Sequence, residues 1–389
     1  MKRQLRKGYT TGTCAAAAAK AAARRLLGGS GEQVSRIPTR TGTVACLPAV
    51  LLEETEEKVR FGVRKDAGDD PDVTDGALIC ASVRRTGGEW EPSWYEDSAH
   101  PGIYIEGGRG VGRVTRPGLS CPVGKAAINP VPREMIWEAV EEVRRELGRE
   151  EELLVTVEIP DGELLAEKTF NPKLGIEGGI SVLGTTGIVE PMSEAALLAT
   201  IQLEIHMKAV EGVPYLAVTP GNYGETFLRE QMGISLEQGV KCSNFVKDTM
   251  VMLAEEGYRE SLFAGHAGKL IKAAGGVENT HSRWGDRRME ILWDCARAVC
   301  PEELRESLKG EILGSNTTEE AMEYLERAGI RRRTGDEAAA RLQRQILAWT
   351  GGRLRMDVIL FTVGMGIFGC TEEGEGLRAF RLSQRGERP

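Results

Sequence analysis

The sequence predicts two domains of different classes: an α+β domain over residues 1–175 and, over 176–389, an α/β domain with a doubly wound, Rossmann-like parallel sheet. Three observations lead to this prediction. The chain has 389 residues, which suits two or three domains. Strand patterns up to about residue 174 are arranged as hairpins. After Gly178, apolar strands alternate with glycine-containing turns and helices, which favours parallel pairing through right-handed crossovers.

The first domain is expected to open with a helix. Thr11 or Thr13 can cap the alanine-rich run that follows, and this run stops at Gly28-Gly29. A second, amphipathic helix is expected over 133–147, after a proline-containing start. Strand patterns occupy 43–52, 58–65, 77–83, 153–159 and 163–170. The last two flank the turn signal Asp161-Gly162 and therefore predict a hairpin.

The second domain is expected to repeat strand, turn and helix. The expected strands are 179–184, 215–219, 240–242, 261–264 and 357–363. The helices expected between them include 193–210, 224–231 and 244–256. A helical region rich in Ala, Arg and Glu precedes the last strand. This order of elements predicts a sheet with helices on both faces.

Composition excludes several classes of function. Fifty Lys+Arg against 58 Asp+Glu give a net charge of -8, which argues against broad electrostatic binding to nucleic acid or anionic lipid. The eight cysteines are scattered without a C-x-x-C pair, so zinc-site and thioredoxin spacings are absent and reduced thiols in the cytoplasm are expected. The N-terminus lacks an export signal, and the apolar stretch 358–368 is shorter than the roughly 20 residues that span a bilayer.

Three special turns are expected at the carboxyl ends of strands in the second domain. They are Gly184–Gly187, 220–224 (PGNYG) and 265–269 (GHAGK). Open sheets bind ligands at this edge because helix N-termini supply unpaired N–H groups there. None of the turns matches a P-loop or a clean G-x-G-x-x-G. The alternative is that each turn is only a tight connection.

An acidic loop, 66–76 (DAGDDPDVTDG), precedes the strand at 77–83. Its aspartates could bind a hard cation, although their spacing differs from an EF-hand. They could instead cap backbone N–H groups in a structured turn, or accept hydrogen bonds from a substrate's ring nitrogens or amide-like groups. The sequence leaves all three interpretations open.

Two of the four histidines, His266 and His281, lie in a stretch that also contains Lys269, Lys272 and Arg283. The cations could contact carboxylates, and either imidazole could handle a proton near neutral pH. The alternative is an ordinary helix with a solvated basic face. A further set is expected to be structural or inert, because no partner group is defined nearby in the sequence: His100, His206 and Cys14.

Six blocks in order resemble one family closely: LRKGYTTGTCAAAAA (5–19), the acidic loop (66–76), INPVPREMI (128–136), TFNPKLGIEGGISVLGTTGIVEPM (169–192), TPGNYGE (219–225) and the stretch 265–283. The chain resembles the CbiD family, the cobalt-precorrin-5B C-1 methyltransferases of anaerobic cobalamin biosynthesis. The resemblance spans most of the chain but is less distinctive after Trp284, and it implies no role for residues beyond that point.

The resemblance implies transfer of a methyl group from S-adenosylmethionine to carbon 1 of a cobalt-containing corrin precursor, giving cobalt-precorrin-6A. Cobalt would belong to the substrate, so no protein metal site is implied. Because such chemistry depends on positioning, the absence of a hydrolase-like triad from the sequence is compatible with it. The implied partners are this tetrapyrrole and neither nucleic acid nor membrane. A homo-oligomer or transient contact with other enzymes of the pathway stays open.

Site residues follow as hypotheses. The cofactor pocket is expected at Gly184, Thr185, Thr186, Gly187, Gly221, Asn222, Tyr223 and Gly224, with strand-end N–H groups facing the methionine carboxylate and Asn222 or Tyr223 near adenine. The tetrapyrrole is expected between the domains, lined by Thr10, Thr11, Thr13, Asp70, Asp72 and Thr74. Its carboxylates would meet Lys7, Lys269, Lys272 and Arg283, with His266 and His281 as candidate catalytic residues.

Two other classes of function are alternatives to this hypothesis. A nicotinamide-dependent oxidoreductase would need an acidic residue about 20 residues after the first glycine turn to hold a ribose, and Glu204 and Glu211 lie in that interval. A noncatalytic tetrapyrrole carrier would bind the ring without affinity for S-adenosylmethionine. Titration with the cofactor separates these possibilities.

Overall fold

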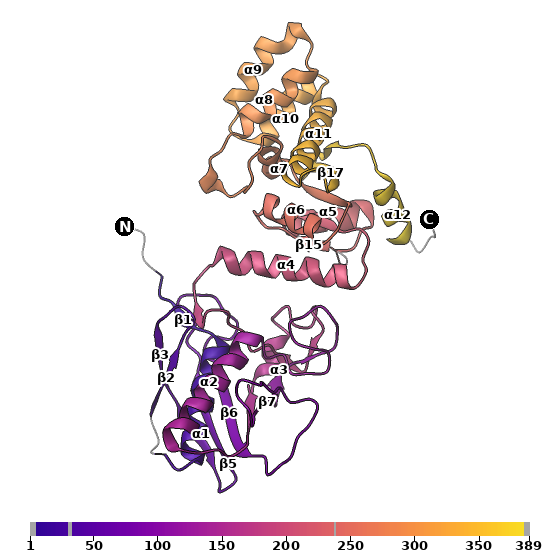
Figure 1. Cartoon of the computed structure of the whole chain (residues 1–389). Coiled ribbons are helices and arrows are strands. Elements are labelled where there is room, and N and C mark those ends of the chain that lie inside the picture. The colour runs from indigo at the N-terminus through magenta and orange to yellow at the C-terminus, as the bar shows by residue number, and fades with distance from the viewer. Residues whose placement is uncertain (1–4, 30–32, 237–238, 385–389) are drawn as a thin grey trace. The chain divides into compact units, whose positions relative to one another are not determined.

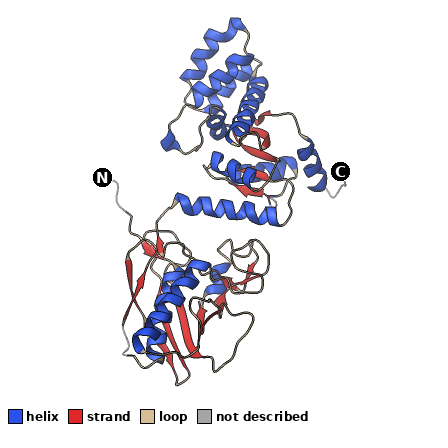
Figure 2. Ribbon diagram, in the orientation of Figure 1, coloured by secondary structure: helices blue, strands red, loops and turns tan. Residues whose placement is uncertain are grey.

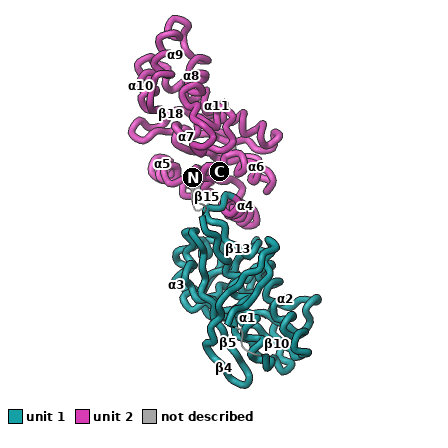
Figure 3. The backbone as a smooth tube through the Cα atoms, turned by 90° about the vertical axis from the view of Figure 1, so that its left-hand side faces the viewer, with its two compact units in different colours: residues 1–194 teal, residues 195–389 magenta. Residues whose placement is uncertain are grey.

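The computed structural model describes residues 5–29, 33–236 and 239–384 and divides the chain into two compact units, 1–194 and 195–389 (Figures 1 and 3). The boundary between the compact units therefore follows Glu194, later in the chain than the domain boundary expected after residue 175. The reason is pairing between distant segments. Strands β11 (Ile176–Glu177), β12 (Gly179–Ile180) and β13 (Ile188–Val189) all pair with strands of the first unit.

Unit 1 is built on a five-stranded sheet. In spatial order its strands are β4 (Val50–Glu54), β5 (Lys58–Arg64), β6 (Leu78–Arg85), β10 (Leu153–Glu158) and β7 (Ile103–Gly107). Only β10 and β7 pair in parallel. The strand patterns expected at 43–52, 58–65, 77–83 and 153–159 each contain a strand of the structure, so these expectations are confirmed.

The alanine-rich helix α1 (Thr11–Leu26) is the centre of this unit. Its alanines are buried, and it packs against α2 (Pro130–Leu147) and against β5 and β6, as Figure 2 shows. Small side chains permit this close approach on several sides. The N-cap is Thr10, whose hydroxyl accepts from the Thr13 N–H, and not Thr11 or Thr13 as predicted.

The hairpin predicted over 153–170 is wrong. β10 already has a partner on each side, so no edge is open to a returning strand. The chain instead forms a short helix, α3 (Gly162–Ala166). A Cβ atom on Gly162 would lie 2.0 Å from the carbonyl oxygen of Gly110, so this turn packs directly on another backbone.

Short ladders complete unit 1. They are β1 (Gly8–Tyr9) with β13, β8 (Gly110–Val111) with β12, β9 (Arg113–Val114) with β11, and β2 (Val34–Pro38) with β3 (Val44–Pro48). The first of these joins the start of the chain to the segment just before the unit boundary.

Unit 2 contains a second five-stranded sheet. Its spatial order is β15 (Gly239–Lys241), β14 (Ala217–Thr219), β16 (Glu260–His266), β17 (Arg355–Thr362) and β18 (Gly366–Cys370). The first four strands are parallel, and β18 is antiparallel to β17. The strands expected at 215–219, 240–242, 261–264 and 357–363 are confirmed as parts of this sheet. The expectation of a strand of this sheet at 179–184 is wrong, because β12 belongs to unit 1.

Helices lie on both faces of this sheet. One face packs against α5 (Asn222–Met232) and α12 (Glu375–Gln384). The other packs into a core shared by α4 (Glu194–Val210), α6 (Val246–Glu255), α7 (Ala267–Ala274) and α11 (Arg331–Trp349). The remaining helices group together in Figure 1: α8 (Arg288–Val299), α9 (Arg305–Gly314) and α10 (Thr318–Arg327). In the described ranges, no helix carries an apolar run long enough to cross a bilayer.

Candidate functional site

The carboxyl ends of β14, β15 and β16 meet at one edge of the second sheet. The chain leaves β14 for β15 on one side and then returns to β16 on the other, so the strand order reverses between β14 and β16. At this edge the Cys242 N–H donates to the Thr219 carbonyl oxygen at 2.8 Å. A Cβ atom on Gly265 would lie 3.0 Å from Pro220 Cδ. A reversal of this kind opens a crevice in which α/β sheets bind ligands.

The turn 220–224 lies at this reversal and begins α5. Gly221 is the N-cap residue and has no side chain to satisfy the first N–H groups. Gly224 is required for packing, because a Cβ atom there would lie 2.7 Å from Thr219 Cβ and 3.1 Å from the Ala264 carbonyl oxygen. The exposed N-terminus of α5 therefore presents backbone donors and the positive end of the helix dipole.

Two side chains flank these donors. Tyr223 is 73% exposed. Asn222 accepts a hydrogen bond at Oδ1 from Lys241 Nζ at 3.0 Å, and Lys241 also pairs with Glu225 at 2.6 Å. The lysine fixes the Asn222 amide so that the Nδ2 group is left to donate elsewhere. The sequence did not single out Lys241, because its contact with Asn222 crosses from β15 to α5.

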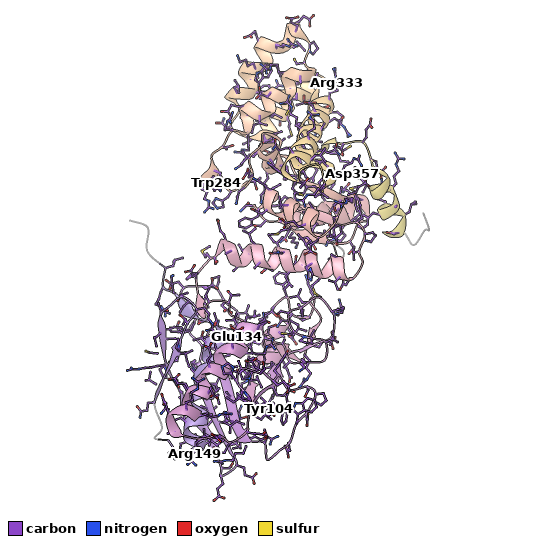
Figure 4. All side chains as sticks on the ribbon, in the orientation of Figure 1. Tyr104, Glu134, Arg149, Trp284, Arg333 and Asp357 are labelled. Carbon is purple, nitrogen blue, oxygen red and sulfur yellow. The ribbon has the colours of Figure 1, made fainter. Side chains whose placement is uncertain are left out.

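A cavity of about 370 Å³ lies at the carboxyl end of β16, at the N-terminus of α7. It is lined by His266, Gly268, Lys269, Lys272, Thr280, Ser282, Gly285, Asp286, Arg288, Thr318 and Glu319. Three residues predicted as site residues therefore come together here: His266, Lys269 and Lys272. His281 and Arg283 stand on the adjoining loop, next to Trp284, which Figure 4 labels.

Among the described residues, neither lysine of this cavity forms an ion pair, and Asp286, whose charge acts on Lys272, is paired with Arg288. Lys272 is only 6% exposed and donates to the carbonyl oxygens of His281 at 3.4 Å and Gly285 at 3.3 Å. Burial lowers the pKa of Lys269, the neighbouring Cys242 opposes this shift, and the charge of Lys272 adds to it. Both lysines lie on α7, one turn apart.

Both candidate catalytic histidines act as helix caps. His266 Nδ1 accepts from the Gly268 N–H at 3.2 Å, and His281 Nδ1 accepts from the Arg283 N–H at 3.1 Å. A neutral imidazole that accepts at Nδ1 carries its proton on Nε2. For His266 this Nε2 lies 3.5 Å from Glu319 Oε1. Either ring could take up a further proton only by giving up its cap, so the proton-handling role stays a prediction.

Two threonine hydroxyls in the cavity were missed by sequence reasoning. Thr280 and Thr318 are 5% and 1% exposed, and neither Oγ1 has a hydrogen-bond partner among the residues that the structure describes. Buried hydroxyls are normally satisfied, so each one needs an explanation. No local sequence pattern marks them, because Thr318 reaches α7 from the distant start of α10 and the burial of Thr280, just after α7, depends on tertiary packing.

In unit 1, the predicted site residues near the N-terminus of α1 form hydrogen bonds with the segment 183–187. Thr13 Oγ1 donates to the Gly187 carbonyl oxygen at 2.7 Å, and Thr11 exchanges hydrogen bonds with the Leu183 backbone. Thr10 caps α1. The turn Gly184–Gly187 thus rests on the N-terminus of α1, and the expectation that it ends a strand of the parallel sheet is wrong.

The aspartates of the acidic loop also find their hydrogen-bond and ion-pair partners within the protein. Asp72 forms an ion pair with buried Lys65 and accepts from both the N–H and the hydroxyl of Thr74 at 2.7 Å. Asp70 accepts from the Met192 N–H at 2.9 Å. The other aspartates bond to Arg6 or to backbone N–H groups: Asp66, Asp69 and Asp75. Among the residues that the structure describes, no group of His, Cys, Asp and Glu is arranged to hold a metal ion.

The remaining candidates have local partners. Lys7 pairs with Glu190 at 2.5 Å, His100 with Asp97 at 2.7 Å and His206 with Glu256 at 3.0 Å. Burial raises the pKa of the Cys14 thiol to about 12, which leaves it protonated and inert at neutral pH.

Comparison with known proteins identifies the family. The CbiD family model matches residues 1–191, and the model of the CbiD C-terminal domain matches residues 279–372. A cobalt-precorrin-5B C(1)-methyltransferase from Ruminiclostridium cellulolyticum is 42% identical over 92% of this chain and 90% of the relative. One from Moorella thermoacetica is 40% identical over 96% of each chain. This chain belongs to the CbiD family.

A solved structure is also similar in sequence. The crystal structure of the cobalamin biosynthesis protein (cbiD) from Archaeoglobus fulgidus is 27% identical, covers 76% of this chain and 84% of its own, and has a TM-score of 0.38.

Proposed function

We infer that this protein transfers the methyl group of S-adenosylmethionine to carbon 1 of cobalt-precorrin-5B, giving cobalt-precorrin-6A and S-adenosylhomocysteine. The observation that carries this inference is identity of about 40% with relatives named for that reaction, over nearly the whole length of both chains. Cobalt enters the reaction as part of the substrate.

The chemistry is a displacement at the methyl carbon. The new bond forms between that carbon and ring carbon 1, the carbon–sulfur bond breaks, and its electron pair stays on sulfur. A proton leaves the tetrapyrrole. The reaction is accelerated mainly by holding the two molecules in line and close together, so residues that position the ligands matter most.

We propose that unit 2 is a doubly wound, Rossmann-like domain that holds S-adenosylmethionine at the carboxyl edge of its parallel sheet, and that unit 1 is the tetrapyrrole side. The reversal of strand order between β14 and β16 and the uncapped N-terminus of α5 support this assignment of the cofactor. Within this pocket Gly221–Gly224 contact the cofactor. A role for Gly184–Gly187 in cofactor binding stays a prediction. It was expected because this turn was placed at the end of a strand of the parallel sheet, and the turn lies in unit 1 instead.

The first experiment measures the reaction. The purified protein is titrated with S-adenosylmethionine by calorimetry, and cobalt-precorrin-5B is then added anaerobically. The expected products are a tetrapyrrole heavier by one methyl group and S-adenosylhomocysteine, both detected by mass spectrometry. Binding of the tetrapyrrole with neither cofactor heat nor methylation would instead identify a carrier.

Asn222→Ala tests the cofactor pocket. Loss of the amide donor should weaken S-adenosylmethionine binding more than about tenfold, because a polar ligand group would lose its partner in the complex. Gln231→Ala is the matched control, since it removes an exposed amide from the far end of the same helix. Equal affinities of the two variants for the cofactor would remove Asn222 from the pocket.

The oxidoreductase alternative loses its sequence support. Glu204 lies inside α4, and Glu211 directly follows that helix, so neither stands at the end of a sheet strand. The cytoplasmic location stays a prediction, as does any homo-oligomer or contact with other enzymes of the pathway.

A further inference from the structure

The cavity on α7 contains two lysines that form no ion pair with any described residue. Three lysines are buried among the described residues: Lys20, Lys65 and Lys272. Lys20 pairs with Glu142 at 2.7 Å, and Lys65 pairs with Asp72. Lys272 has only two long contacts to carbonyl oxygens, and half-buried Lys269 stands one helical turn away. Buried charges are normally paired, so this cavity departs from the pattern of the rest of the chain.

The unsatisfied hydroxyls point to the same place. Thr318 Oγ1 would lie 3.2 Å from a Cβ atom on Gly268, so this hydroxyl sits over the first turn of α7. Thr280 lines the cavity from the segment that follows α7. In the described part of the chain, two buried hydroxyls without hydrogen-bond partners and two lysines without ion pairs share this cavity. A bound anion would satisfy all four groups.

The charge of the lining favours an anion of single charge. Arg288 is neutralised by Asp286 at 2.5 Å, and Glu319 faces His266. The lining has three cations and two carboxylates, which leaves one surplus positive charge while His266 is neutral: Lys269, Lys272 and Arg288 against Asp286 and Glu319. Burial also lowers the pKa of Lys269. A doubly charged phosphate would also meet the nearby Glu319, whereas a carboxylate brings one charge and two acceptor oxygens.

We propose that this cavity is a carboxylate-binding site in which Lys269 and Lys272 contact the ligand's oxygens and Thr280 and Thr318 donate hydrogen bonds to them. The identity of the ligand rests on the proposed function, which offers two sources of a carboxylate. One is the methionine moiety of S-adenosylmethionine, and the other is an acetate or propionate arm of the tetrapyrrole.

The test uses two variants of the full chain. Lys269→Gln removes one cation, and Thr280→Val removes a hydroxyl that has no protein partner while keeping its shape. Each variant is titrated with S-adenosylmethionine, with cobyrinic acid, a cobalt corrinoid with free carboxylate arms, and with cobinamide, an amidated corrinoid. Lys309→Gln on the exposed surface of α9 is the control for loss of one positive charge.

Both variants should weaken one carboxylate ligand about tenfold or more and leave cobinamide binding unchanged. Loss confined to S-adenosylmethionine assigns the site to the cofactor, and loss confined to cobyrinic acid assigns it to the tetrapyrrole. Unchanged affinities for both carboxylate ligands overturn the proposal, as does an equal loss in Lys309→Gln. Thr280→Val keeps the test valid if Lys269→Gln fails to fold.

The outcome is independent of the proposed reaction. A wild-type protein that binds a carboxylate ligand through Lys269 but yields no methylated product would keep this site and refute the methyltransferase function. Methylation by wild type, together with unchanged ligand affinities in both variants, would refute the site and keep the function.

Discussion

The acidic loop of unit 1 and the cavity on α7 of unit 2 differ in how far the protein itself satisfies their charged and polar groups, although similar sequence features mark both. The loop and the segment 265–283, which supplies His266, Lys269 and Lys272 to the cavity, are both short stretches with charged residues beside glycines. In the loop, each of the five aspartates meets a cation or an N–H group. In the cavity, two lysines form no ion pair and two threonine hydroxyls have no hydrogen-bond partner in the described part of the chain. A network that is complete in the protein stabilises the fold, whereas an incomplete one is suited to a ligand.

The largest effect is expected from breaking the complete network. Asp72→Asn should lower the free energy of unfolding by about 3 kcal/mol, because it leaves the charge of Lys65 buried without a partner. Urea denaturation measures the difference. The double variant with Lys65→Met should recover much of the loss, since it removes the stranded charge. A single variant as stable as wild type would place Asp72 outside the structural network and return it to the substrate-binding candidates.

The same pair predicts a pH dependence. Burial alone would raise the pKa of Asp72, but the charge of Lys65 and the hydrogen bonds from Lys65 and Thr74 outweigh it and lower the pKa below the ordinary 3.8. A lowered pKa stabilises the folded state above the ordinary value, and this contribution is lost as the pH falls through the folded value. The stability gap between wild type and Asp72→Asn should therefore be constant near neutral pH and shrink below 3.8. A gap that persists at lower pH would contradict the ion pair as its cause.

Replacing His266 separates capping from proton transfer. His266→Ala should cost about 1 kcal/mol, because the first turn of α7 loses its acceptor, whereas His266→Asn keeps an acceptor and should cost less. Thermal denaturation of both variants gives this difference. The pH–rate profile of His266→Asn gives the second readout. If a limb of that profile disappears while the helix remains capped, the imidazole carries a proton in the reaction.

Much of the fold was predictable because it depends on local patterns. The alanine run predicted α1, alternating apolar residues predicted β5, and a short continuous apolar run predicted β6. The prediction of a hairpin after β10 was wrong for a non-local reason, because β6 and β7 pair with the two edges of β10. The boundary between the units also differs from the expected domain boundary for a non-local reason, because Ile188–Val189 pairs with Gly8–Tyr9 in a two-residue ladder.

The site was predictable only in part. Lys269, Lys272 and His266 share one sequence block, and the structure brings them to one cavity. Thr280 and Thr318 could not be predicted, because what distinguishes them is the missing partner of a buried hydroxyl, and burial depends on packing of the whole unit. For the acidic loop the sequence left three interpretations open, and the structure shows the aspartates capping backbone N–H groups, as one of them expected. The ion pairs with Lys65 and with the distant Arg6 were not predicted.

The smallest effect on stability is expected from removing one lysine charge of the cavity. Lys269→Met should leave the stability of the ligand-free protein within about 0.5 kcal/mol of wild type or slightly above it, because methionine keeps the apolar stem and removes a charge that no carboxylate compensates. Because burial lowers the pKa of Lys269, folded wild type releases this proton more readily than the unfolded chain does. Wild type should therefore gain stability relative to the variant as the pH rises from the lowered pKa toward the ordinary 10.5. The other ionisable groups in or beside the cavity are common to both proteins: Cys242, His266, Lys272, Asp286, Arg288 and Glu319. The difference between the two proteins isolates Lys269, and a large loss of stability in the variant would show that its charge completes the fold and does not await a ligand.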